Sequence, residues 1–438
     1  SFREYGALVI AAQRQRRSIK ELEELSPGDG LITGIGQIRS STENEKLITV
    51  AIAIYDNSVF AGTQGYMGHR KIERLFSLAR DRGYPVILFA EGGGGRPGDI
   101  DAYRAIGFDM MPFVSLAQLN GHVPIIGIAT GSCFAGNAAF LGCSDLIIAT
   151  SKSNIGMAGP AMIEGAGLGQ FKAGEIGSSD VQTQSGVIDI LVDSDIEAIA
   201  RTKAILSYVF NTEMNWTAHD QHQLQSLIPV APNQGFDIRQ LVSTLCDKKS
   251  VMELRSNFGK AIATFIARVE GRSIGIVAND CLFNGGAIDS DAADKFSRFL
   301  NLCNFYRLPV LTLCDTPGFM VGPEAEKTAT VRHAARILVS AAKLTVPMMT
   351  VIIRKSFGLG AQAMAGGSFH RPTATLSWPD ATYGAMGLEG AVKLGFKKEL
   401  DSISDPAMRE LRFSELLQEF QAKGSAINVA SYFEVDDV

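Results

Sequence analysis

Apolar residues in the first half of the chain recur with the spacing of an amphipathic helix, and an apolar strand follows at once. The pattern predicts a helix over residues 68–80, a break at the Gly-Tyr-Pro of residues 83–85, and a strand over residues 86–90. One face of the helix is apolar at positions i, i+3, i+4 and i+7, which are Ile72, Leu75, Phe76 and Ala79. Glycines come directly after the strand.

The second half of the chain repeats this order. An apolar stripe predicts a helix that ends before Leu308 and leads into a strand over residues 310–314. A Val-Pro pair then opens a further strand in each half, at residues 123 and 346, and each of these strands leads into a turn of small residues. The stripe consists of Ala292, Phe296, Phe299, Leu300 and Cys303.

Matched positions in the two halves are separated by nearly the same interval, which indicates an internal repeat. The separations are 224, 223 and 224 residues for Pro85 with Pro309, Pro124 with Pro347, and Gly136 with Gly360. Short, continuous apolar strands between helices are typical of a mainly parallel sheet. Before the first helix, residues 31–38 and 47–53 predict two strands joined by a polar turn at residues 40–45. The sequence therefore predicts an α/β protein that uses one module twice.

The repeat and the length of the chain predict two domains of ordinary size. We expect residues 1–24 to form a charged leading helix, residues 25–225 to form the N-terminal domain and residues 226–438 to form the C-terminal domain.

The composition is that of a folded protein, with 46% apolar residues, 20% charged residues and a net charge of −5. The chain has no block of Lys and Arg, so we expect no nucleic-acid partner. Residues 123–144 are uncharged, but glycines interrupt them, so we expect a buried strand, turn and helix rather than a membrane span. Six cysteines without a C-x-x-C pair favour a reducing compartment. We expect a cytoplasmic location, with the mitochondrial matrix as the alternative, and a chain that is part of a longer protein.

Conventional catalytic motifs are missing: the sequence has no H-E-x-x-H, P-loop lysine or G-x-S-x-G motif. His219 and His222 have no third ligand in view, so we expect a polar turn there and no metal site. The remaining candidates are glycine-rich turns after strands, at residues 92–95, 135–136 and 359–360. One such turn is explained equally by tight strand-to-helix packing. Two equivalent turns favour main-chain N–H groups that hold an anionic oxygen.

Eight short motifs follow one another along the chain. They begin at Gly28 (GDG), Phe60 (FAGTQG), Glu91 (EGGGGRPG), Gly131 (GSCFAG), Asp315 (DTPGF), Arg354 (RKSFGLG), Ser377 (SWP) and Met386 (MGLEGA). In this order and spacing the chain resembles the carboxyltransferase β subunits of propionyl-, methylcrotonyl- and acetyl-CoA carboxylases. The resemblance spans roughly residues 25–438 and rests on the whole series, because each motif alone is weakly specific.

The resemblance implies two tandem crotonase-like ββα-spiral domains. It implies transfer of a carboxyl group from carboxybiotin to the α-carbon of an acyl-CoA. The N-terminal domain of one subunit would hold the acyl-CoA, and biotin would approach the C-terminal domain of another subunit, in a homo-oligomer that is typically a hexamer. Biotin carboxyl carrier and biotin carboxylase domains or subunits would be the protein partners, and this domain would need no metal.

The resemblance also implies site residues. Ala135 and Gly136 stand at the family's N-domain oxyanion peptide, where Gly-Gly is common, and Leu359 and Gly360 stand at the C-domain peptide, where Gly-Ala is common. Backbone donors at both places would stabilise enolates without a side-chain general base. Arg96 would either meet a CoA phosphate or ribose or serve as a structural ion-pair partner. The substrate-binding positions implied are Gly93, Gly94, Gly95, Arg96, Phe134, Phe357, Gly358, Gln362, Met386 and Gly387.

Other functions stay open at this point. A hydratase, isomerase or decarboxylase on the same fold would need positioned carboxylates, and four are candidates: Glu91, Glu164, Asp315 and Glu389. The same site would serve a biotin-dependent acyl-CoA decarboxylase. A non-catalytic scaffold subunit is the third alternative. The sequence does not determine the acyl chain length or whether the biotin carboxylase is fused to this chain.

Overall fold

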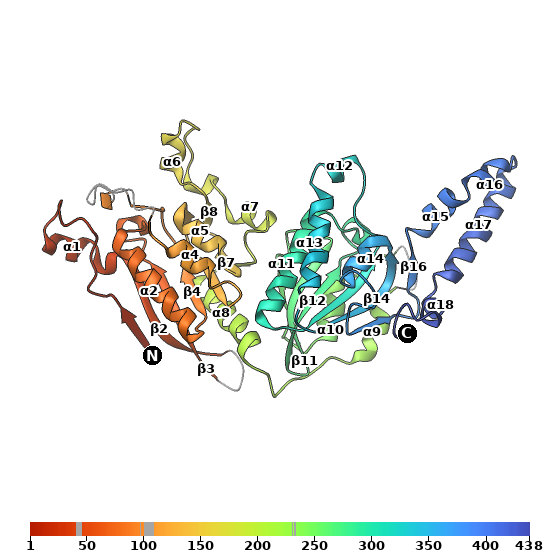
Figure 1. Ribbon diagram of the computed structural model, residues 1–438, viewed down its shortest axis with the longest axis horizontal. Helices are drawn as coiled ribbons and strands as arrows, with labels where there is room; N and C mark the ends of the chain where they lie inside the picture. Colours follow the sequence, from red (N-terminus) through yellow and green to blue (C-terminus); the bar gives the residue numbers. More distant parts are fainter. Residues whose placement is uncertain (41–45, 97, 100–108, 230, 232–233) are drawn as a thin grey trace. The chain divides into compact units, whose positions relative to one another are not determined.

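The structure is a computed structural model, and it describes residues 1–40, 46–96, 98–99, 109–229, 231 and 234–438. These residues form two compact units, 1–213 and 214–438 (Figure 1). The predicted α/β class is confirmed in both units. The polar turn expected at residues 40–45 falls almost entirely on residues 41–45, which lie outside the described part of the chain.

A mixed sheet forms the centre of the first unit. Its first three strands pair antiparallel, which confirms the predicted hairpin, and the others pair parallel. In order across the sheet the strands are β1 (Phe2–Tyr5), β2 (Leu31–Arg39), β3 (Leu47–Tyr55), β4 (Val86–Phe89), β5 (Ile125–Ala129), β7 (Leu146–Thr150) and β9 (Ile190–Val192). A parallel pair beside it consists of β6 (Ser132–Phe134) and β8 (Asn154–Gly156).

The sheet of the first unit is covered by α2 (Tyr66–Arg82), α5 (Gly136–Gly142) and α8 (Asp195–Phe210), which pack against its strands. The predicted helix at residues 68–80 is confirmed as part of α2, and Gly83 ends it in the left-handed conformation that favours glycine, with φ +67°. The α-helices are α1 (Ile19–Leu25), α2 (Tyr66–Arg82), α4 (Pro112–Ala117), α5 (Gly136–Gly142), α6 (Pro160–Gly165), α7 (Ser179–Gln184) and α8 (Asp195–Phe210).

The leading segment differs from the single helix expected over residues 1–24. Residues 2–5 form the edge strand β1, and the helix α1 begins only after Ser18, whose side chain caps it in a capping box with Glu21. Gly34 on β2 leaves room for this strand, because a Cβ there would lie 2.5 Å from the ring of Phe2. Pairing with β2 therefore overrides the helical pattern of the charged residues.

The second unit repeats the arrangement. Its first strands again pair antiparallel and the following ones pair parallel. The strands are β10 (Met252–Leu254), β11 (Ile262–Val269), β12 (Arg272–Asn279), β13 (Val310–Thr316), β14 (Met348–Phe357) and β15 (Ala374–Ser377), with β16 (Thr382–Gly384) also paired to β14.

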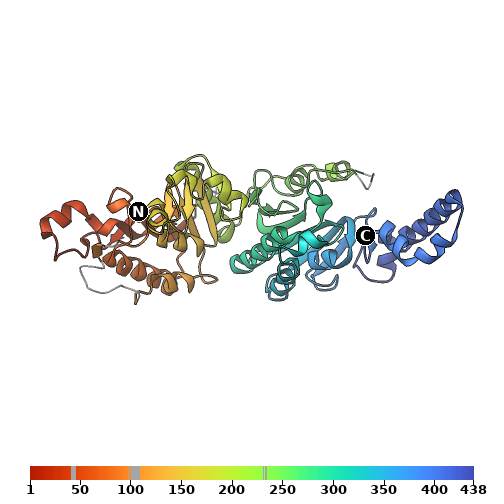
Figure 2. The ribbon, with the colours of Figure 1, turned by 90° about the horizontal axis from the view of Figure 1, so that it is seen from above.

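The long helix α11 (Ser290–Tyr306) packs against the second sheet, and α13 (Thr330–Ala342) packs against α11 (Figure 1). A group of helices near the end of the chain, α15 to α17, projects from that sheet in both views (Figure 2). The α-helices of the unit are α9 (Leu224–Leu227), α10 (Ile238–Leu245), α11 (Ser290–Tyr306), α12 (Pro323–Glu326), α13 (Thr330–Ala342), α14 (Gly358–Met364), α15 (Leu388–Gly395), α16 (Lys397–Ser402), α17 (Pro406–Lys423) and α18 (Ala426–Ser431). None of the described helices combines the length and the apolar character needed to cross a membrane.

Equivalent hydrogen bonds confirm the internal repeat. The N–H of Gln64 donates to the carbonyl of Gly94 at 2.6 Å, and the N–H of Ile288 donates to the carbonyl of Gly318 at 3.0 Å. Both members of the second pair lie 224 positions after those of the first. Each bond ties the loop before the long helix to the loop that follows the central strand, so the same connection is built twice.

Candidate functional site

In the first unit, the glycine run after β4 passes over the start of α5. The N–H of Gly94 donates to Oδ1 of Asn137 at 3.1 Å. Gly94 has φ +88°, and a Cβ built there would lie 2.6 Å from the Cβ of Ala135 and 3.3 Å from the backbone nitrogen of Gly136. Glycine is therefore required at position 94, because a side chain would cover the first turn of α5.

The peptide Ala135-Gly136 opens α5, as the motif at residues 131–136 predicts. Ala135 adopts φ 51° and ψ −122°, which is rare for a residue with a Cβ. Its N–H already donates to the carbonyl of Gly156 at 3.0 Å. The N–H of Gly136 lies in the first helical turn, where N–H groups lack an acceptor within the helix. Of the two, Gly136 is therefore the residue whose N–H can face an anion.

Arg96, at the end of the glycine run, is 5% exposed. Its guanidinium forms an ion pair with Asp29 and lies 4.7 Å from the centre of the Phe60 ring. It also donates to the carbonyl of Thr63 at 3.0 Å. Burial raises the pKa of Asp29, and the charge of Arg96 opposes that rise. Of the two roles considered for Arg96, this geometry favours the structural ion pair, which joins the GDG motif to the glycine run.

In the second unit, the DTPGF loop lies over the start of α14 in the same way. A Cβ at Gly360 would lie 2.6 Å from Cα of Gly318, so only the missing side chain allows this close packing. Thr316 anchors the loop, because its hydroxyl donates to the carbonyl of Gly286 at 2.7 Å and accepts from the N–H of Gly318 at 3.1 Å. Gly318 is thus the counterpart of Gly94.

The strand register corrects one match between the halves. Val86 pairs with Ile125 in the first unit, and Val310 pairs with Met348 in the second. Val310 lies 224 positions after Val86, but Met348 lies only 223 positions after Ile125. The offset between equivalent residues is therefore 223 in the strands that lead into α5 and α14. The counterpart of Gly136 is therefore Leu359 and not Gly360. The small-residue pattern suggested the wrong partner because position 136 and position 360 are both glycine.

A cavity of about 600 Å³ lies beside the start of α14. The N–H groups of Leu359 and Gly360 belong to the first turn of this helix, where acceptors within the helix are missing. Gly358 has φ +58°, and a Cβ there would lie 2.9 Å from the carbonyl oxygen of Ala385. The residues around the cavity include Ser356, Gly358, Leu359, Ala361, Gln362, Phe369, Tyr383, Met386, Leu388, Phe420, Lys423 and Glu434.

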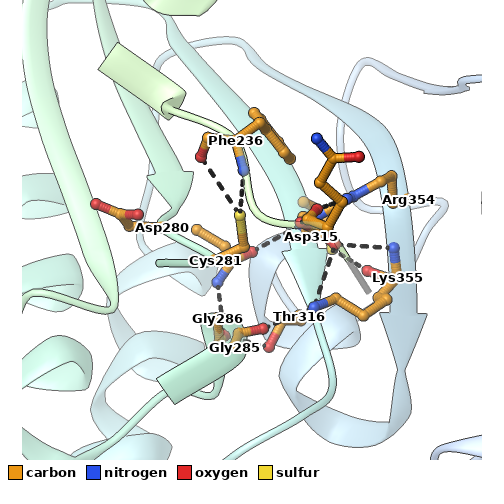
Figure 3. A network of polar contacts seen from close by, with 12 residues as sticks. Phe236, Asp280, Cys281, Gly285, Gly286, Asp315, Thr316, Arg354 and Lys355 are labelled. Carbon is orange, nitrogen blue, oxygen red and sulfur yellow. Dashed lines mark hydrogen bonds and ion pairs between the residues drawn. The ribbon is translucent and has the colours of Figure 1, made fainter. Parts of the chain in front are cut away.

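A buried ionic network supports β13 and β14 just before this cavity (Figure 3). Asp315 is fully buried and accepts from the guanidinium of Arg354 at 2.7 Å and from the N–H of Lys355 at 3.1 Å. The Arg354 guanidinium lies 4.6 Å from the centre of the Phe236 ring. The Lys355 ammonium donates to the carbonyl of Gly285 at 2.7 Å. Asp315 is thus engaged as a structural partner of the two cations.

The charged side chains among the cavity residues are Lys423 and Glu434. Tyr383 donates its hydroxyl to Oγ of Ser377 at 2.8 Å, and burial raises its pKa to about 12. This phenol therefore stays protonated at neutral pH. The cavity offers N–H and O–H donors and one ammonium group, but no histidine among the residues that line it.

The structure brings several predicted site residues together. Gly358, Leu359, Gln362 and Met386 all line the cavity at α14. Gly387 lies beside it as the N-cap of α15. Two aromatic residues take core positions instead, because Phe134 is 5% exposed and Phe357 is 8% exposed. Gly93 and Gly95 flank Gly94, and a Cβ at either would meet no atom closer than 3.4 Å.

Sequence reasoning missed three polar residues at the two sites. Lys423 and Glu434 reach the α14 cavity from the end of the chain, and no motif marked them. Gln64 lies against Gly136 in the first unit. The interval of 224 residues could have marked Gln64, because its counterpart in the second repeat is the apolar Ile288.

Comparisons with known proteins agree with this architecture. The family model described as "Carboxyl transferase domain" matches residues 1–438. The methylmalonyl-CoA carboxyltransferase 12S subunit of Propionibacterium freudenreichii subsp. shermanii is 31% identical, over 100% of this chain and 82% of its own length. The biotin-dependent long chain acyl-coenzyme A carboxylase beta4 subunit of Mycobacterium tuberculosis is 31% identical, over 85% of this chain and 72% of its own length.

Two solved structures are similar over the whole chain. A single-chain, multi-domain long-chain acyl-CoA carboxylase is 46% identical with a TM-score of 0.91, and this chain spans 43% of that longer chain. The transcarboxylase 12S structure, described as a hexamer with methylmalonyl-CoA bound, is 30% identical with a TM-score of 0.87, and 83% of it is covered.

Proposed function

Because the chain belongs to the carboxyl transferase domain family, we propose that it transfers a carboxyl group from carboxybiotin to the α-carbon of an acyl-CoA. The crotonase-like fold expected for both repeats is confirmed by the likeness to the solved carboxyltransferases. The observation that carries the proposed chemistry is the pair of equivalent turns, in which a glycine loop lies over the first N–H groups of a short helix.

In the N-terminal domain, assigned to residues 25–225, the thioester oxygen of the acyl-CoA accepts a hydrogen bond from the N–H of Gly136. Removal of the α-proton moves negative charge onto that oxygen, so a fixed donor stabilises the transition state more than the ground state. Gly94 keeps the approach to this N–H open. Arg96 and Asp29 hold the glycine loop in place, so the backbone donor needs no rearrangement during the reaction.

In the C-terminal domain, assigned to residues 226–438, the cavity at α14 receives the biotin ring. Biotin would supply the carboxyl group and, once it has released that group, the base that accepts the α-proton. The residues fit such a ring, because the cavity combines main-chain donors with the apolar surface of Leu359, Met386 and Phe420. The N–H groups of Leu359 and Gly360 would hold the ring oxygen, and the ammonium of Lys423 would add positive charge nearby.

The relatives support a proposal for the partners. The transcarboxylase 12S structure is a hexamer, and we propose a homo-oligomer, with six subunits as the first expectation. A biotin carboxyl carrier and a biotin carboxylase supply the carboxylated cofactor, either as separate subunits or on one longer polypeptide. One relative is a single-chain, multi-domain acyl-CoA carboxylase. We propose a long-chain acyl-CoA as substrate, because that relative has 46% identity and its name specifies a long-chain acyl-CoA.

The decisive experiment supplies the purified protein with a biotinylated carrier, a biotin carboxylase, ATP and bicarbonate. Acetyl-, propionyl-, decanoyl- and palmitoyl-CoA are offered in turn, and carboxylated products are measured by mass spectrometry. We expect product only when the carrier is present, and the fastest formation with palmitoyl-CoA. Binding of acyl-CoA by the assembled oligomer without any product from the four thioesters would instead establish a scaffold.

A further inference from the structure

The side chain of Gln64 is buried at the first unit's site, and its amide nitrogen, Nε2, has no hydrogen-bond acceptor among the described residues. Gln64 is 5% exposed. A buried amide N–H without an acceptor destabilises the folded protein, because its desolvation is not compensated. Such a buried group calls for an explanation.

The Gln64 amide lies directly against the peptide that carries the free N–H. A Cβ built on Gly136 would lie 2.5 Å from Oε1 and 3.2 Å from Nε2 of Gln64. The backbone holds Gln64 from both sides, because its N–H donates to Gly94 at 2.6 Å and its carbonyl accepts from Arg96 at 3.0 Å. The amide is therefore fixed beside the first turn of α5.

Asn137 is a second buried amide beside Gly94, and its hydrogen bonds only support the fold. Its Oδ1 accepts from Gly94 at 3.1 Å, and its Nδ2 donates to the carbonyls of Gly62 and Glu91 at 3.3 and 3.0 Å. Every polar atom of Asn137 is used. By contrast, Nε2 of Gln64 has no hydrogen-bond partner among the described residues.

The second repeat shows that the fold does not need an amide at this position. Ile288, the counterpart of Gln64, is fully buried and makes the equivalent backbone hydrogen bond to Gly318. The counterpart of Gly136 is Leu359, whose side chain is 68% exposed and lines the α14 cavity. In the first repeat the corresponding space beside the helix is taken by the Gln64 amide. The two repeats therefore differ by a polar donor at one site and an apolar side chain at the other.

We propose that Nε2 of Gln64 is a second donor to the thioester oxygen of the acyl-CoA, beside the N–H of Gly136. This inference rests on the proposed carboxyl transfer. The amide forms a neutral hydrogen bond to the ground-state carbonyl and a charge-assisted one once the oxygen becomes anionic, so its effect is concentrated in the transition state. The site thus combines a main-chain donor with a side-chain donor that only the acyl-CoA repeat carries.

The test replaces Gln64 with Ile, the residue of the second repeat, and separately with Met, which keeps the length of the side chain. A hydrogen bond to a charged group contributes about 1.5–3 kcal/mol, so we expect kcat for decanoyl-CoA carboxylation to fall about 10- to 100-fold. We expect KM to change less than threefold. Gln37→Ile, which makes the same change at an exposed position of β2, serves as the matched control.

A second readout separates a donor from a packing role. The wild-type protein should bind decanoyl-CoA more tightly than its S-decyl thioether, which lacks the carbonyl oxygen. Gln64→Ile should reduce this preference, by less than threefold because the N–H of Gly136 remains as a donor, while the affinity for the thioether stays unchanged. Wild-type kcat in both variants, or an equal loss of affinity for thioester and thioether, would overturn the role of Gln64. A wild-type protein that carboxylates none of the four thioesters would refute the proposed function itself.

Discussion

Lys71 and Lys295 are equivalent buried lysines, 224 positions apart on α2 and α11. Lys71 is 8% exposed and donates from Nζ to the carbonyl of Gly28 at 2.7 Å. Lys295 is fully buried and donates from Nζ to the carbonyl of Phe258 at 3.0 Å. Each lysine thus joins the long helix of its repeat to a backbone carbonyl of an earlier segment. This pair belongs to the scaffold that the two repeats share, in contrast to the Gln64 position, where they differ.

Stability should rise with pH because of Lys295. Burial lowers its pKa from 10.5 to about 7, against the attraction of Glu253. Between pH 7 and 10.5 the unfolded chain therefore binds more protons at this site than the folded protein, and the free energy of unfolding increases with pH. The slope from this one group is at most about 1.4 kcal/mol per pH unit. Lys295→Met should flatten the profile in chemical denaturation, and an unchanged slope would contradict the assignment.

Gly94→Ala should abolish most of the activity without unfolding the protein. Its Cβ would lie 2.6 Å from the Cβ of Ala135, so the loop or the start of α5 must move. A displacement of about 1 Å at a reacting group can reduce the rate about 100-fold, and we expect a loss of that order in kcat. Gly142→Ala, at the other end of α5, meets no atom within 4 Å. This control should keep wild-type activity and circular dichroism.

Leu359 allows the main-chain donor of the second repeat to be removed alone. Leu359→Pro deletes the N–H in the first helical turn, where proline is tolerated, and Leu359→Ala keeps it. Loss of one oxyanion donor reduces the rate about 10²- to 10³-fold, so kcat should fall by that factor in the proline variant and remain near wild type in the alanine variant. Equal rates in the two variants would argue against a donor at Leu359.

Gly136→Pro is a less selective probe of the first site. The position of a Cβ at Gly136 is 2.5 Å from Oε1 of Gln64, so the ring would displace this side chain as well as remove the N–H. A rate loss in this variant alone could not separate the two effects.

Asp315→Ala should strongly destabilise the second unit. The change leaves the guanidinium of Arg354, which is 7% exposed, without its carboxylate partner. Breaking a buried ion pair from one side destabilises proteins by about 3–5 kcal/mol, so the midpoint of urea unfolding should fall clearly. Glu324→Ala removes an exposed ion pair with Lys327 and should change stability by less than about 1 kcal/mol. Similar midpoints for the two variants would show that the network around Asp315 is not stabilising.

Local patterns were sufficient for most elements of the fold. The apolar stripes identified α2 and α11 because one face of each helix must be buried, and this requirement repeats every three to four residues. The failures arose where distant segments met. Residues 2–5 form a strand because β2 offers a paired edge, and Leu359, rather than Gly360, matches Gly136 because the strand register shifts by one residue.

The sequence by itself determined the α/β class, the duplicated module, the family and the two glycine turns, since each depends on residue types at short or regular spacing. Only the tertiary structure decided which groups face those turns. It placed Arg96 in a buried ion pair, brought Lys423 to the α14 cavity and left the Nε2 of Gln64 without a partner. These relationships join residues far apart along the chain, and their distances are set by the packing of whole elements, which local spacing does not encode.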